Sequence, residues 1–276
     1  MGDTLRRLVL PLALCAALGG AALAQDQQQS GYHSVTCIKV RDGKMGEYRE
    51  FMKESRKVGQ VMADSGMMAT SLRFRSVMPV GAAATCDFLF VNLYQGTPPA
   101  PLGPDAFAEN LKKAHISMSA DDYLARRSSL SQVVSSEMWR IAIQVGDIQK
   151  GDYAFLNYMK VHDADNWMEL ERSVWKPMAE TWVKDGTLHG WFVAQLVLPS
   201  GTGAKYQAVT LDVLPNWDAA FKGIPVDKTW KQVHSDKDEN QFFEKIGKTR
   251  DLDLRTLIVL EDTIVPSGKA SSAGGQ

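Results

Sequence analysis

Residues 32–42 read YHSVTCIKVRD, and residues 153–163 read YAFLNYMKVHD, so one pattern returns at an offset of 121 residues (153 − 32). Both stretches are short, rich in apolar and β-forming residues, and end at a polar turn, which predicts a β-strand in each place. A repeat of this length has to be recognised first, because it decides how the rest of the chain is divided. The pair predicts a chain of two similar halves.

The first half continues with a helix, two strands, further helical segments and a last strand. Apolar residues recur at three- and four-residue steps from Met45 to Met62, which predicts a helix with one apolar face. Thr70–Met78 and Thr85–Tyr94 flank a Pro/Gly/Ala turn and predict a hairpin. A strand over 138–145 closes the half, so its order is β-α-β-β-α-β.

The second half repeats this order in the same spacing. A helical pattern over 167–182 contains Pro177, which should kink it. Strands are predicted over 191–198, 205–214 and 254–260. The offset between corresponding residues is 121 at the first strands and 119 at two histidines described below. It therefore changes by only two residues along the chain. This regularity favours duplication of one unit over chance.

A β-α-β-β-α-β order is that of the ferredoxin-like unit, whose antiparallel sheet has helices on one face only. The other apolar face needs cover, and two units on one chain can cover each other. We therefore expect an α+β fold of two tandem ferredoxin-like modules, residues 31–150 and 151–265, packed as an intramolecular dimeric α/β barrel.

In element order and duplication, the sequence resembles the dimeric α/β-barrel superfamily. WKP at 175–177, Gly186 and GW at 190–191 are similar to a pattern in uncharacterised secreted members. The superfamily includes cofactor-free monooxygenases, haem proteins related to chlorite dismutase and NIPSNAP-like proteins. The resemblance implies the architecture and brings no diagnostic catalytic motif.

The N-terminus is typical of an exported protein. Arg6 and Arg7 precede an apolar run over 8–23 that ends in ALA before Gln25. This is the pattern of a secretory signal peptide, residues 1–24, cleaved after Ala24. We expect a periplasmic or extracellular protein, with structureless polar tails at 25–30 and 266–276.

Composition excludes several classes of partner. The chain has 31 Lys and Arg against 32 Asp and Glu, a net charge of −1, which gives no electrostatic case for nucleic acid. No later apolar run is long enough to span a membrane, so we expect no membrane contact once the signal is removed. No metal-binding spacing occurs, and we expect neither a metal nor another cofactor. Association of identical chains stays open.

Two cysteines, Cys37 and Cys86, remain after signal removal. They fall on the first and third strands of the predicted unit, which are neighbours in its sheet. In the second half their positions hold Tyr158 and Tyr206, so the pair is replaced as a pair, as expected for residues in contact. The two interpretations are a disulfide, which export permits, and two buried thiols.

The aromatic residues point to a ligand pocket in the second half. Six of the seven tryptophans lie there. Apolar ligand sites are lined by aromatic residues with a few polar groups, although aromatic residues equally build ordinary core. The predicted pocket residues are Trp175, Trp191, Tyr206 and His189.

Candidates for acid-base chemistry are few. His189 lies two residues before Trp191 and is the first candidate for a general base, with Asp212 as the second. His115 and His234 share one position of the repeat at an offset of 119 (234 − 115), as a retained functional residue or an inherited surface or capping residue.

Three functions follow from these patterns. The first is binding of a small apolar or aromatic molecule in the second half. The second is a cofactor-independent oxygenase or isomerase-type enzyme, similar to some superfamily members. The third and weakest is haem binding through a histidine.

Overall fold

The computed structural model describes residues 31–269. The predicted signal peptide, the predicted N-terminal tail and residues 270–276 lie outside the described residues. In the described part, eight strands close into one antiparallel barrel in the order β1-β3-β2-β8-β5-β7-β6-β4. The strands are β1 (Tyr32–Val40), β2 (Thr70–Met78), β3 (Phe88–Leu93), β4 (Ser131–Gly146), β5 (Tyr153–Val161), β6 (Gly190–Leu198), β7 (Ala208–Leu214) and β8 (Arg250–Ile264).

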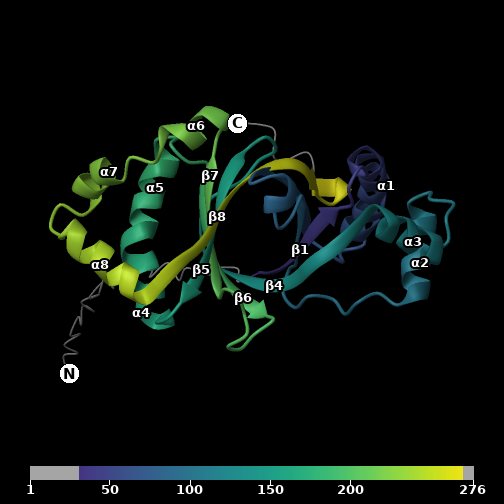
Figure 1. The fold of residues 1–276 in the computed structure, drawn as a ribbon, viewed down its shortest axis with the longest axis horizontal. Helices are drawn as coiled ribbons and strands as arrows, with labels where there is room; N and C mark the ends of the chain where they lie inside the picture. The colour runs from purple at the N-terminus through teal and green to yellow at the C-terminus, as the bar shows by residue number, and fades with distance from the viewer. Residues whose placement is uncertain (1–30, 270–276) are drawn as a thin grey trace, which may run out of the picture.

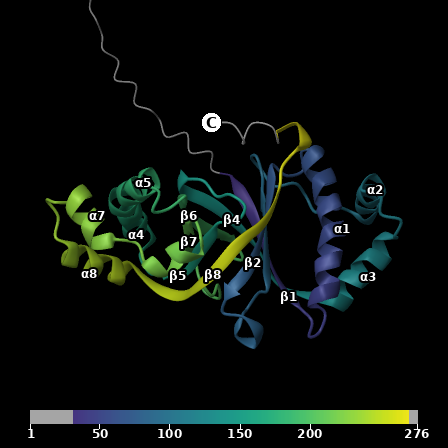
Figure 2. The ribbon, with the colours of Figure 1, turned by 90° about the horizontal axis from the view of Figure 1, so that it is seen from above.

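Helices cover the barrel on two opposite sides (Figures 1 and 2). On one side lie α1 (Met45–Asp64), α2 (Pro104–Lys113) and α3 (Ala120–Leu130). On the other side lie α4 (Ala164–Leu170), a π-helical turn (Glu171–Trp175), α5 (Lys176–Lys184), α6 (Trp217–Lys222), α7 (Val226–Val233) and α8 (Glu239–Thr249). Short 3-10 turns occur at Gly81–Ala83 and Ser267–Lys269. The architecture is α+β, as expected.

Both halves pair their strands in the same order and register. The order β4-β1-β3-β2 in the first half corresponds to β8-β5-β7-β6 in the second. Val35 pairs with Glu137 between β1 and β4, and Leu156 pairs with Thr256 at the corresponding place between β5 and β8. Pairing of β2 with β8 and of β4 with β6 joins the halves and closes the barrel.

Several predicted strand ends are corrected. β3 and β7 begin at Phe88 and Ala208, three residues later than expected, because the preceding residues belong to loops. β4 and β8 are much longer than predicted, over 131–146 and 250–264. Their first residues are largely exposed, and β1 and β5 pair with them. The start of β4 lacks the apolar alternation that predicts a strand, whereas the start of β8 shows it at Leu252 and Leu254.

The alternation of side chains along each strand divides the apolar residues between the barrel interior and two outer cores. On β1, Cys37 packs inside the barrel, whereas Ile38 packs beneath α1. The outer core of the second half contains Trp167, Trp182, Trp191 and Trp230. This core accounts for most of the tryptophans that distinguish the second half.

Pro177 interrupts the first long helix of the second half. A proline has no N–H to donate, and the chain forms a π-helical turn just before it. The Nε2–H of the buried His234 donates to the carbonyl oxygen of Val174 at 3.1 Å, so the histidine satisfies a backbone group in this turn.

Glu171 in the same turn is a fully buried carboxyl, 1% exposed. Its burial raises its pKa to about 8, against an opposing effect of the Arg250 guanidinium. Because the unfolded chain ionises this group near 4.5, the folded state holds an extra proton between about pH 4.5 and about pH 8.

The structure pairs Cys37 with Cys86 in a disulfide inside the barrel. Cys86 lies two residues before β3 begins, in the loop and not on the strand. Ser267 also has fixed contacts, since its backbone N–H donates to Asp64 at 2.7 Å, and the predicted C-terminal tail therefore begins in ordered structure.

The disulfide should contribute strongly to stability. It closes a loop with a sequence separation of 49 residues, for which the chain-entropy model gives about 4 kcal/mol. The double variant Cys37→Ala/Cys86→Ala should lose about that much unfolding free energy in urea titrations. Wild-type protein in reducing agent should match the variant, and an unchanged midpoint in both would contradict this role.

Substituting Glu171 should change how stability depends on pH. Wild-type stability should fall as pH rises from about 4.5 to about 8, because the unfolded chain releases the Glu171 proton first. Glu171→Gln cannot ionise, so its stability relative to wild type should rise across this window by up to about 1.4 kcal/mol per pH unit. Urea titrations at several pH values measure this difference. The exposed Glu169→Gln is the matched control, and a difference between Glu171→Gln and wild type that stays constant with pH would refute the effect.

Candidate functional site

The barrel interior is hollow. A first cavity of about 380 Å³ lies at the end near the disulfide, and a second cavity of about 390 Å³ lies at the end where β1 begins. Val35, Leu89, Glu137 and Tyr158 line both cavities, so the two spaces adjoin in the middle of the barrel. Residues from both halves form these walls.

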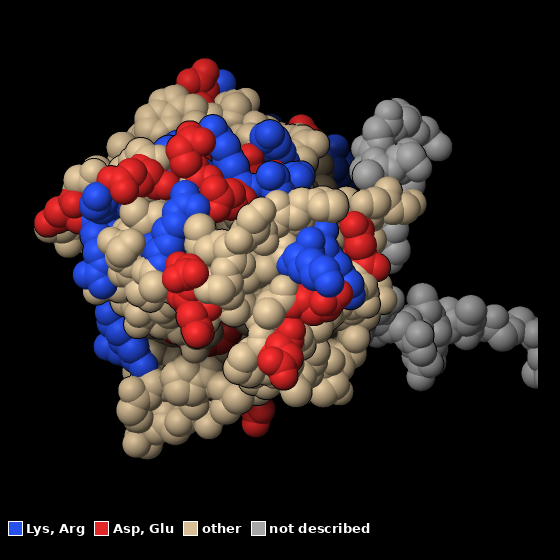
Figure 3. All heavy atoms as spheres, turned by 90° about the vertical axis from the view of Figure 1, so that its right-hand side faces the viewer, with Lys and Arg blue, Asp and Glu red and all other residues tan. Residues whose placement is uncertain are grey.

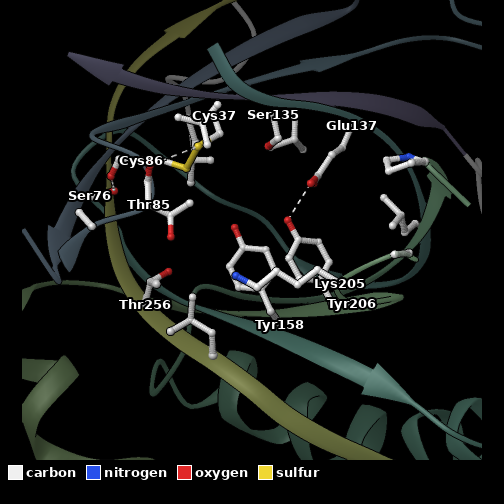
Figure 4. Close-up of a pocket in the computed structure, with 18 of the residues that line it drawn as sticks. Cys37, Ser76, Thr85, Cys86, Ser135, Glu137, Tyr158, Lys205, Tyr206 and Thr256 are labelled. Atoms are coloured by element: carbon white, nitrogen blue, oxygen red, sulfur yellow. Dashed lines mark hydrogen bonds between the residues drawn. A yellow bond between two sulfur atoms is a disulfide. The ribbon is translucent and has the colours of Figure 1, made fainter. Parts of the chain in front are cut away.

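Glu137 on β4 is the acidic group where the two cavities adjoin. One of its carboxylate oxygens accepts a hydrogen bond from the Tyr206 hydroxyl at 2.7 Å, as Figure 4 shows. The other accepts a bond from the Trp139 indole N–H at 3.1 Å. These two donors fix the carboxylate against the wall and leave it further capacity to accept.

Two tyrosines stand beside this carboxylate. The rings of Tyr158 and Tyr206 have centroids 4.5 Å apart. Loss of hydration raises the pKa of both phenols, and the nearby Glu137 charge raises the pKa values further, so both keep their protons at neutral pH. The Tyr158 hydroxyl points into the cavity (Figure 4) and has no hydrogen-bond partner among residues 31–269.

The disulfide forms part of the wall of this first cavity (Figure 4). Cys37 and Cys86 occupy the positions of the repeat that Tyr158 and Tyr206 occupy in the second half. The expectation that these positions touch is met in both halves, by a covalent bond in one and a ring contact in the other.

The second cavity is mainly apolar. Its wall includes Leu72, Phe74, Leu156, Phe192, Leu211 and Ile258. His33 also lines it, and burial lowers the pKa of this imidazole to about 4, so the ring is neutral at physiological pH. The formally charged residues at the ends of the two cavities, Lys205 and Asp147, are exposed to solvent.

The structure does not bring the four predicted pocket residues together. Tyr206 lines the first cavity, but Trp191 is on the opposite face of the sheet and packs in the outer core. Trp175 also lies outside the barrel, where the centroid of its ring is 5.7 Å from the centroid of the Phe242 ring. Both tryptophans therefore belong to the core between the sheet and the helices of the second half.

The two predicted proton acceptors lie apart from the cavities as well. The Nδ1 atom of His189 is 2.9 Å from a carboxylate oxygen of the buried Asp152, outside both cavity walls. Asp212 lies on the outer face of β7, where it accepts a hydrogen bond from the Asn157 amide at 3.0 Å. Burial raises the pKa of Asp212, so its surroundings favour the protonated acid.

The two histidines of the repeat do not form one site. His234 is buried against the π-helical turn. His115 is exposed and follows the end of α2 with a positive φ of 56°. In the described part of the chain neither has a position suited to a shared ligand, and the His234 contact is that of a capping residue.

The sequence interpretation missed Glu137 and Tyr158 as functional candidates. The pairing of Tyr158 and Tyr206 with the two cysteines was the available signal for Tyr158. Glu137 has no such signal, because it lies in the part of β4 that was not predicted as strand.

We also examined residues 31–269 for a metal site, a membrane-spanning helix and a charged surface patch. No group of three or more His, Cys, Asp or Glu side chains there could hold a metal ion. No helix there combines the length and apolar character needed to cross a bilayer. On the face carrying α1 to α3, basic and acidic side chains are interspersed, as Figure 3 shows.

Comparison with known proteins shows similarity of fold. No protein-family model matches the sequence, and no curated protein matches it. The structure of a "putative monooxygenase" from Lactobacillus acidophilus NCFM is similar, with a TM-score of 0.50 and 12% identity, over 86% of this chain and 96% of that chain. A "putative monooxygenase" from Fusobacterium nucleatum gives a TM-score of 0.52 at 10% identity, over 86% of this chain and 94% of that chain. The chain therefore has an α+β fold like that of the dimeric α/β-barrel proteins.

Proposed function

We propose that this protein binds a small apolar or aromatic molecule inside its barrel. The observation that carries the proposal is a hollow interior in which the Tyr158 hydroxyl has no hydrogen-bond partner in the described part of the chain and adjoins the Glu137–Tyr206 pair. An unpaired polar group inside a protein costs free energy unless a ligand or water bonds to it. A ligand there would gain both a hydrogen bond and an apolar surrounding.

The size and lining of the interior support this function. Ligand sites usually occupy about 300–1,000 Å³ and combine apolar walls with a few polar groups. The two cavities, at about 380 and about 390 Å³, fall in this range. The proposed site thus lies between the two halves, whereas the sequence placed it within the second.

The alternative is a cofactor-independent oxygenase or isomerase-type enzyme. Two proteins of similar fold are described as monooxygenases. The interior also places a carboxylate beside two phenols, and these groups can donate or accept a proton. In this alternative Glu137 takes the role that the sequence suggested for His189 or Asp212. Failure to consume oxygen with any of a panel of quinols and polyphenols would count against it.

The proposal includes duplication and export. Equal strand order and register in the two halves support descent from one ferredoxin-like unit. The Cys37–Cys86 disulfide supports an oxidising compartment, since such bonds are rare in the cytosol. An exported protein whose N-terminus is not near Gln25 would contradict the cleavage after Ala24.

Filling the interior should weaken ligand binding strongly. Leu89 lines both cavities, so Leu89→Trp places an indole where they adjoin. A ligand found by thermal-shift or native mass-spectrometric screening of apolar compounds should lose at least tenfold in affinity. Haem belongs in the same panel, and a Soret shift on its addition would reveal it.

The matched control is the next residue on the same strand. Phe90 packs against the outer core of the first half, so Phe90→Trp should retain ligand affinity. Circular dichroism and Tm measurements establish that both variants are folded. Equal affinity of a folded Leu89→Trp protein and wild type would place the ligand elsewhere and refute the proposal.

A further inference from the structure

The first cavity has more hydroxyl groups on its wall than the second. Glu137, Tyr158 and Tyr206 face the first cavity, together with serine and threonine side chains on its wall: Ser76, Thr85, Ser135 and Thr256 (Figure 4). The second cavity continues from Glu137 and Tyr158 between aliphatic and aromatic walls. A ligand that fills both spaces therefore has a polar end and an apolar chain.

The hydrogen-bonding groups specify the kind of polar end. The Tyr158 hydroxyl stays protonated and can donate, while Glu137 carries a carboxylate that accepts one bond at each oxygen and can accept more. A hydroxyl group meets both requirements, because it donates to a carboxylate and accepts from a phenol. An ammonium group could not accept the Tyr158 bond.

The charges facing the interior disfavour an anion. Glu137 would repel a carboxylate placed beside it, and His33, the histidine on the cavity wall, is neutral. The cation at the edge, Lys205, is exposed, where water weakens its attraction for a buried group. Asp147 at the opposite end adds a second negative charge.

We propose that the ligand is a neutral, elongated molecule whose hydroxyl group bonds to Glu137 and Tyr158 and whose apolar chain occupies the second cavity. This inference rests on the proposed function, since it names the class of molecule bound inside the barrel.

The test uses displacement of the neutral fluorescent probe N-phenyl-1-naphthylamine from the purified mature protein at pH 7.4. Competitors are straight-chain 1-alkanols and matching alkanoates of 6 to 12 carbons. Alkanol affinity should rise about threefold to fourfold per methylene, the fold-change expected for burying each CH₂, until the second cavity is full. Each alkanol should bind at least tenfold more tightly than the alkanoate of equal length.

Variants of the two hydrogen-bonding residues test the polar end. Tyr158→Phe should weaken alkanol binding about fivefold, the fold-change for one lost hydrogen bond, with the affinity for the probe itself measured separately for this variant. Glu137→Gln should narrow the gap between alkanols and alkanoates. Tyr94→Phe and Glu109→Gln, at positions outside both cavities, are the matched controls and should behave as wild type.

A variant in the second cavity tests the apolar chain. Leu211→Phe narrows this cavity, so it should weaken binding of 12-carbon alkanols while 6-carbon alkanols bind as before. Equal loss for all chain lengths would overturn the assignment of the chain to this space.

The outcomes separate this inference from the proposed function. If neither the probe nor any competitor binds, both proposals fall. A second outcome is that Leu89→Trp weakens probe binding, while alkanoates bind wild type as tightly as alkanols do. If Lys205→Gln then weakens alkanoate binding, the barrel binds a carboxylate and the inference is overturned. Independence from chain length would also overturn it.

Discussion

The structure depends on covering the apolar inner faces of two four-stranded sheets. Each sheet buries one face under helices, and its other face would meet water if the halves were apart. Pairing of β2 with residues 257–264 of β8, and of β6 with residues 138–146 of β4, joins the sheets edge to edge. Closure thus covers the exposed faces and pairs the edge strands along these segments.

Closure also creates the interior space. Where two flat sheets meet face to face, their side chains can interdigitate and fill the gap, but a closed barrel of eight strands encloses room that side chains fill or leave to a ligand. Here Phe74, Leu156 and Ile258 fill part of it. Polar groups such as Glu137 then find partners in their own wall, while Tyr158 is left facing the remaining space.

The sequence alone predicted the order of the elements and the closed α+β architecture. Apolar periodicity marks each helix or strand locally, and the repeat indicates two similar units. It also predicted that positions 37 and 86 touch. It could not place the pocket, because the tryptophans that suggested one lie on the helix-covered face, and strand alternation gives two faces without saying which lies inside. The exposed start of β4 was missed for a related reason, since its sequence does not alternate and pairing with β1 makes it a strand.

The six-residue connection between β4 and β5, residues 147–152, places both halves on one polypeptide. A barrel assembled from two identical subunits would repeat every wall residue across its twofold axis, so the two ends of its lumen would be lined by the same residues. When both halves lie on one chain, their wall residues can differ. One wall carries a disulfide where the other carries a pair of phenols, and the lumen acquires a direction that an unsymmetrical guest molecule can follow.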